Sequence, residues 1–97
     1  MNASIVFQKL IKDLPLQDQK YINSKINKYN RLLLELFVKK IYNYPFLINL
    51  LQKEIIESIS PKLQTEDQYS FFLNVIKGNS RTYIKAYNFL KRKKRWN

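Results

Sequence analysis

The sequence predicts a mainly α-helical protein without a β-sheet. Apolar residues recur every three or four positions over most of the chain, which is the period of one face of an α-helix. The strict alternation of apolar and polar residues that marks a strand is missing, and one glycine in 97 residues gives little support for tight hairpin turns. We expect a long helix and a helical hairpin, followed by a basic C-terminal turn-helix extension.

Three prolines divide the chain into four segments, because proline cannot continue a helix from within. The segment before Pro15 predicts a short helix over residues 3–13. The next segment predicts the long helix, over residues 17–42, with its apolar positions aligned as one stripe. These positions are Ile22, Ile26, Tyr29, Leu33, Leu36, Phe37 and Ile41.

A third helix is expected between Pro45 and Ser60, folded back on the long helix by a short turn at residues 43–45. Its predicted core stripe is Leu47, Leu50, Leu51, Ile55 and Ile59. We therefore divide the chain into an N-terminal helical hairpin region, residues 1–63, and a basic C-terminal region, residues 64–97. The two regions are expected to form one structural unit.

The C-terminal region is predicted to begin with a capped helix. The Thr65 hydroxyl can accept a hydrogen bond from the backbone amide of Gln68, whose side chain can reach back to the cap. We expect this helix to stop near Lys77, because Gly78 can adopt the left-handed conformation that ends helices. A second, basic helix is then expected from Arg81 onward.

Positive charge is concentrated in this last part of the chain. Residues 77–97 hold eight Lys or Arg and no acidic residue, in a chain of net charge +11. Like charges repel, so the segment indicates a polyanionic partner, either nucleic acid or an anionic membrane surface. Tyr83 and Tyr87 share one face of the basic helix, where they would either stack on unpaired bases or pack on the core.

The composition excludes several kinds of site. Cysteine and histidine are both absent, which rules out disulfides, zinc sites built on these residues and Cys or His nucleophiles. No apolar run approaches the ~18 residues of a membrane span, and the N-terminus resembles no targeting signal. We expect a protein that is not an enzyme and has no metal, cofactor, membrane or small-molecule partner.

The candidate nucleic-acid contacts are polar and cationic residues of the C-terminal region. Lys and Arg neutralise phosphates, and a turn over residues 77–80 would let a phosphate approach the backbone near Gly78. The candidates are Lys77, Asn79, Ser80, Arg81, Lys85, Lys91, Arg92 and Arg95.

Residues 75–92, VIKGNSRTYIKAYNFLKR, resemble the signature of the universal small-subunit ribosomal protein fourteen family. Gly78, Ser80 and Arg81 match that signature directly. Upstream, residues 28–40, KYNRLLLELFVKK, are similar to the Lys-Arg-Leu-Leu-Leu helix of the family. The family's zinc-binding members carry two Cys-x-x-Cys pairs, so a chain without cysteine resembles the zinc-free form.

The resemblance implies a structural component of the small ribosomal subunit head, which binds rRNA through Lys and Arg and supports assembly and translation. Its neighbours would be small-subunit rRNA and the universal ribosomal proteins three, ten and nineteen. Residue types with AT-rich codons make up about half of the chain, which favours an organelle-encoded protein on ribosomes of the mitochondrial matrix. A cytoplasmic ribosome is the other location considered.

Two other functions would use the same residues. A small helix-turn-helix DNA-binding protein would have residues 65–76 as its first helix, residues 77–79 as its turn and residues 81–94 as its recognition helix. A peripheral amphipathic protein would instead dock on a protein partner or an anionic membrane.

Overall fold

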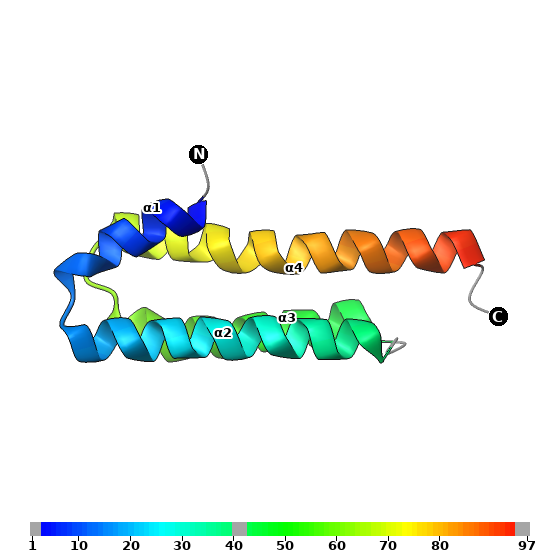
Figure 1. Cartoon of the computed structure of the whole chain (residues 1–97), viewed down its shortest axis with the longest axis horizontal. Coiled ribbons are helices and arrows are strands. Elements are labelled where there is room, and N and C mark those ends of the chain that lie inside the picture. The colour runs from blue at the N-terminus through cyan, green and yellow to red at the C-terminus, as the bar shows by residue number, and fades with distance from the viewer. Residues whose placement is uncertain (1–2, 40–42, 95–97) are drawn as a thin grey trace.

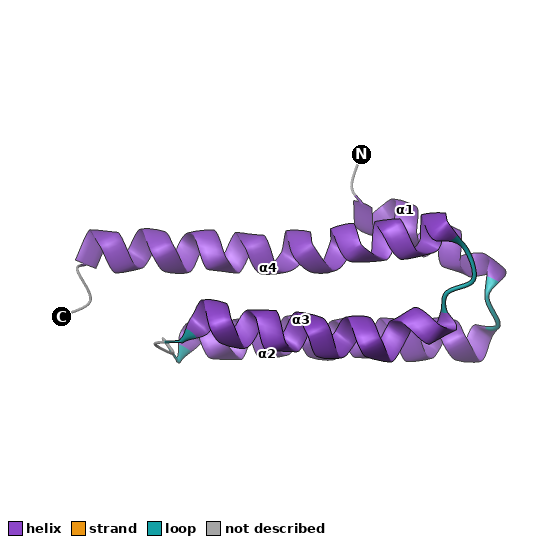
Figure 2. Ribbon diagram, turned by 180° about the vertical axis from the view of Figure 1, so that it is seen from behind, coloured by secondary structure: helices purple, strands orange, loops and turns teal. Residues whose placement is uncertain are grey.

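The computed structural model describes residues 3–39 and 43–94. Within these two ranges all regular structure is helical and no strand occurs, which confirms the predicted fold class (Figure 2). The α-helices are α1 (Ala3–Leu10), α2 (Leu16–Val38), α3 (Tyr44–Ile59) and α4 (Glu66–Lys94), and the 3₁₀ turns η1 (Ile11–Asp13) and η2 (Ser60–Lys62) follow α1 and α3.

The helices run up and down along one long axis (Figure 1). α2 and α3 form an antiparallel hairpin, α4 packs along both, and α1 covers only the N-terminal half of α4. The molecule measures 50 × 25 × 17 Å. α4 has 29 residues and therefore spans about 43 Å of that length, so that its C-terminal end extends beyond the hairpin (Figure 1).

α1 is held in place by contacts with α4 and α2. The rings of Phe7 and Phe72, both fully buried, lie 5.8 Å apart. The side-chain amide of Gln68 donates a hydrogen bond to the Leu10 carbonyl oxygen at 3.1 Å. Because Leu10 meets Gln68 and Phe7 meets Phe72, α1 runs antiparallel to α4 and leaves the second half of α4 without a covering helix.

The predicted hairpin forms with small differences at its ends. Pro45 lies in the first turn of α3, where a missing amide breaks no helical hydrogen bond. The hydroxyls of Tyr21 and Ser58 lie 2.8 Å apart and bridge the two helices. The predicted long helix is found as α2, and the part of it expected at residues 40–42 lies outside the described residues.

The core stripe of α3 differs from the prediction at Leu50, which is exposed. The buried positions are Tyr44, Ile48, Ile55 and Ile59. They follow one another at spacings of four and seven residues, which keeps them on one face, whereas Leu50 lies two residues from Ile48 and so faces away. The buried face of α3 therefore runs through Tyr44 and three isoleucines, and Leu47 and Leu51 of the predicted stripe are only half-buried.

The predicted cap of the last helix is confirmed. The backbone amide of Gln68 donates a hydrogen bond to the Thr65 hydroxyl at 3.1 Å. The backbone amide of Thr65 donates in return to the side-chain oxygen of Gln68 at 3.3 Å. This reciprocal pair satisfies two amides that the first turn of α4 would otherwise leave free. Gln68 thus caps α4 with its oxygen while its nitrogen holds α1.

The predicted helix end and turn at residues 77–80 are wrong, because α4 continues through Gly78 to Lys94. A glycine within a helix costs only about 1 kcal/mol relative to alanine. Burial of Ile76 and Tyr87 on one helical face offsets that cost, since apolar burial contributes roughly 1.5–3 kcal/mol for each large side chain. A Cβ atom at Gly78 would meet no atom within 4 Å, so close packing does not require glycine there.

Candidate nucleic-acid interface

Five exposed cations lie together on one side of the C-terminal half of α4, and a sixth, Lys93, lies away from them. With 3.6 residues per turn, the five occupy about one third of the helix circumference. The opposite side of the same helix packs on α2 and α3. We call this surface the cationic face, and its members are Lys77, Arg81, Lys85, Lys91 and Arg92.

The cationic face is long enough to follow several phosphates. Lys77 and Arg92 are fifteen residues apart, which corresponds to about 22 Å along the helix. Lys77, Arg81 and Lys85 recur every four residues, so successive cations are about 6 Å apart along the axis. A rigid helix therefore holds them in a row, which flexible lysines on a loop would not maintain.

The C-terminal half of α4 carries no carboxylate, because the sequence contains no Asp or Glu after Asp67. Ion pairs form elsewhere among the described residues, Lys39 with Glu35 at 3.0 Å and Lys62 with Asp18 at 3.8 Å. The negative end of the α4 dipole also lies at its cationic C-terminal end and reduces the repulsion. The helix can thus tolerate a surface that strongly attracts anions.

The structure places the eight predicted contact residues in three groups. Lys77, Arg81, Lys85, Lys91 and Arg92 come together on the cationic face. Asn79 and Ser80 face the neighbouring helices instead. Arg95 lies outside the described residues.

The positions of Asn79 and Ser80 differ from those expected of nucleic-acid contacts. The Asn79 amide donates to the side-chain oxygen of Asn30 on α2 at 2.9 Å. Ser80 is 1% exposed, and its hydroxyl donates to the Lys77 carbonyl oxygen at 3.1 Å and accepts a bond from the Gln52 amide. Both positions were predicted from a turn that does not form. In a continuous helix Ser80 is buried and Asn79 is half-buried against α2.

The two tyrosines of the basic segment belong to the core. Tyr87 is 3% exposed, and its ring stacks on that of Tyr44 at 4.9 Å. The half-buried Tyr83 ring lies edge-on to Phe37 at 5.6 Å. Of the two roles considered for these rings, packing is therefore confirmed.

Among the described residues of this segment, Phe89 has an exposed ring, which was not predicted as part of the site. It is 56% exposed and lies beside the cationic face. Its position could have been found from the helical period, because Phe89 falls outside the stripe of Tyr83, Tyr87 and Leu90. A shallow hollow surrounds the ring, lined by Lys85, Asn88, Phe89, Lys91 and Arg92.

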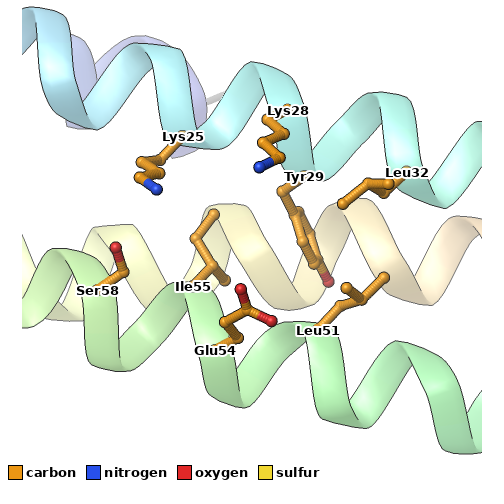
Figure 3. A pocket seen from close by; sticks show the side chains of 8 residues that line it. All are labelled: Lys25, Lys28, Tyr29, Leu32, Leu51, Glu54, Ile55 and Ser58. Carbon is orange, nitrogen blue, oxygen red and sulfur yellow. The ribbon is translucent and has the colours of Figure 1, made fainter.

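A second hollow, between α2 and α3, is too small for an organic ligand (Figure 3). Its volume of about 50 Å³ holds a few waters, whereas ligand sites typically measure about 300–1,000 Å³. Tyr29 forms part of its wall, and burial raises the pKa of this hydroxyl, with nearby Ser80 and Gln52 partly offsetting the rise. The lining residues are Lys25, Lys28, Tyr29, Leu32, Leu51, Glu54, Ile55 and Ser58.

α2 presents a separate group of exposed cations, Lys20, Lys28 and Arg31, on its own solvent side. This group lies on a different helix from the cationic face, and acidic Glu35 follows Arg31 by one helical turn. It therefore provides a comparison of equal charge for any experiment on α4.

The chain matches no protein-family model, no curated protein and no solved structure. Within residues 3–39 and 43–94, no group of three or more acidic side chains could hold a metal ion. Over the same ranges, no helix combines the length and apolar character needed to cross a membrane. The cationic face is thus the surface on which a functional proposal can be built.

Proposed function

We propose that the protein binds structured RNA through the cationic face of α4 and serves as a structural component of the small ribosomal subunit. The observation that carries the proposal is the row of five exposed cations on a helix face without a carboxylate. Such a row neutralises phosphates and releases counterions, which supplies affinity without reading the base sequence.

The rigid bundle gives this affinity a shape requirement. α2 and α3 hold one side of α4 up to the contact of Tyr87 with Tyr44, and the continuous helix keeps the cations in order along about 22 Å. A folded RNA presents phosphates from several strands at defined positions, and a straight cationic helix fits only some of them. Shape therefore supplies specificity that the charges alone lack.

The ribosomal assignment rests on the resemblance of residues 28–92 to ribosomal protein fourteen. It is supported by a small basic chain, net charge +11, in which five exposed cations share one face of α4. The proposed partners are small-subunit rRNA and ribosomal proteins three, ten and nineteen, in mitochondrial ribosomes or otherwise cytoplasmic ones. The role is structural, without catalysis.

The helix-turn-helix alternative requires a turn between its two helices, and that turn is absent. Its turn was assigned to residues 77–79, which lie inside the continuous helix α4. A helix-turn-helix needs two helices set at an angle across that turn. We therefore do not carry this function further.

Sedimentation of ribosomes from the cells that make the protein tests the ribosomal assignment. Tagged protein is expected to move with the small subunit through a sucrose gradient at moderate salt. Release at high salt is expected as well, because phosphate contacts weaken as salt rises. Protein that stays at the top of the gradient at moderate salt would contradict the assignment.

A further inference from the structure

Phe89 occupies an unusual place for an exposed aromatic residue. Single exposed apolar side chains are common and need no explanation by themselves. Phe89, however, lies four residues after Lys85 and three before Arg92, so both cations neighbour the ring on the helix surface. Asn88 completes the hollow around it.

The chemistry of this hollow fits one nucleotide. A phenyl ring offers a flat apolar face on which a base can stack, and Lys or Arg beside it can reach the flanking phosphates. The Asn88 amide carries both donors and acceptors, which the edge of a base can use. Each part of a nucleotide thus meets a side chain suited to it.

The geometry selects an unpaired base over a paired one. In a duplex, both faces of an interior base are covered by its stacked neighbours, so a ring on the outside of a helix cannot reach them. A base splayed out from a loop or a bulge exposes its face. An apolar protein partner fits less well, because it would bury Lys85 and Arg92 without a counter-charge.

We propose that Phe89 stacks on an unpaired RNA base, while Lys85 and Arg92 contact the adjoining phosphates and Asn88 bonds the base edge. This inference rests on the proposed RNA binding and names the part of the RNA that the α4 surface takes. It assigns to Phe89 the role that the sequence analysis considered for Tyr83 and Tyr87.

The test compares full-length protein and its variants by fluorescence anisotropy with two labelled RNA probes. The probes are a 12-nucleotide single strand and an abasic strand of equal length, which keeps the phosphates and lacks the bases. Phe89→Leu removes the aromatic face but keeps an apolar side chain, and Phe89→Tyr keeps the ring. Both substitutions are on the surface, and circular dichroism checks that helicity is unchanged.

Phe89→Leu is expected to weaken binding of the normal single strand by about 5- to 150-fold, which corresponds to about 1–3 kcal/mol. Phe89→Tyr should bind as the original protein does. On the abasic strand, all three proteins should bind equally. A smaller loss with Phe89→Leu, or an equal loss on the abasic strand, would overturn the inference.

The same data separate this inference from the function it rests on. If the original protein binds neither probe at low salt, RNA binding itself fails. If it binds both probes equally and Phe89→Leu changes neither affinity, RNA binding stands and the role of Phe89 is wrong.

Discussion

The rings of Tyr44 and Tyr87 stack face to face, with centroids 4.9 Å apart and planes inclined by 10°. Tyr44 opens α3 and Tyr87 lies in the C-terminal half of α4, so the contact fixes the cationic end of α4 to the hairpin. This end of α4 has no covering contact from α1, which raises the importance of the stack. The surface that we propose for RNA therefore depends on a core contact between tyrosines.

Tyr87→Ala should lower the free energy of unfolding by about 3–5 kcal/mol, because it removes a buried aromatic side chain and leaves a cavity. Tyr69→Ala on the same helix is the matched control, since Tyr69 is exposed, and should cost about 1 kcal/mol or less. Urea unfolding followed by circular dichroism measures both. Equal losses in the free energy of unfolding would show that the Tyr44–Tyr87 stack stabilises the fold no more than an exposed tyrosine does.

The buried hydroxyl of Tyr44 should make the stability of the fold depend on pH in the alkaline range. This hydroxyl donates to the Leu33 carbonyl oxygen at 3.2 Å. Burial, with smaller contributions from Tyr83 and Tyr29, raises the pKa of Tyr44 far above its usual value of about 10. The folded state thus holds this proton more tightly than the unfolded chain does. Its contribution to stability is complete below about pH 10 and is lost as the pH rises further.

Tyr44→Phe should cost about 0.5–1.5 kcal/mol at pH 7, because it removes one hydrogen bond. Above about pH 10, the free energy of unfolding of the variant should fall less steeply, by about 1.4 kcal/mol per pH unit. Tyr29 remains in the variant, so some alkaline sensitivity should persist. Urea unfolding between pH 7 and 11 measures the difference, and parallel curves for the two proteins would contradict the burial of this hydroxyl.

Gly78→Ala should stabilise the protein by about 0.5–1 kcal/mol. Gly78 lies inside α4, and an added methyl group meets no atom within 4 Å. Alanine restricts the unfolded chain more than glycine does and favours the helix. Thermal unfolding checks the sign. A lower melting temperature would indicate that Gly78 adopts the turn that the sequence predicted.

Thr65→Ala should cost about 0.5–2 kcal/mol, because it removes the hydroxyl that caps α4. Thr82→Ala is the control on the same helix. The exposed Thr82 hydroxyl bonds only the Gly78 carbonyl one turn earlier, and alanine is the better helix former, so this change should be neutral or slightly stabilising. Equal destabilisation by both substitutions would contradict the capping role.

Local rules predicted those parts of the fold that depend on neighbouring residues. The reciprocal cap of Thr65 and Gln68 and the apolar stripe of α2 from Ile22 to Leu33 were predicted correctly, because each rests on spacing within one or two helical turns. Gly78 was misjudged because its conformation is decided by partners from other helices. The Ser80 hydroxyl meets Gln52 and the Tyr87 ring meets Tyr44, and neither contact is visible from residues 77–80.

The sequence indicated most of the charged residues of the candidate site, but it did not indicate the continuous helix that positions them. Five of the eight residues chosen lie on one exposed face, since long cationic side chains stay in water unless paired. Asn79 and Ser80 were included only because a turn was expected. Phe89 was missed because the prediction considered only the aromatic residues on the core stripe, and among the described residues of the basic segment Phe89 is the aromatic residue outside that stripe.

The salt dependence of RNA binding by two variants of equal charge tests the central claim most directly. One variant carries Lys77→Gln, Arg81→Gln and Lys85→Gln on α4, and the other Lys20→Gln, Lys28→Gln and Arg31→Gln on α2, so each loses three positive charges. Affinity for a folded RNA, plotted as its logarithm against the logarithm of salt concentration, should lose about 2–3 units of slope with the α4 variant. The α2 variant should keep nearly the original slope. Equal reductions in both would mean that charge acts diffusely and that α4 forms no defined RNA-binding surface.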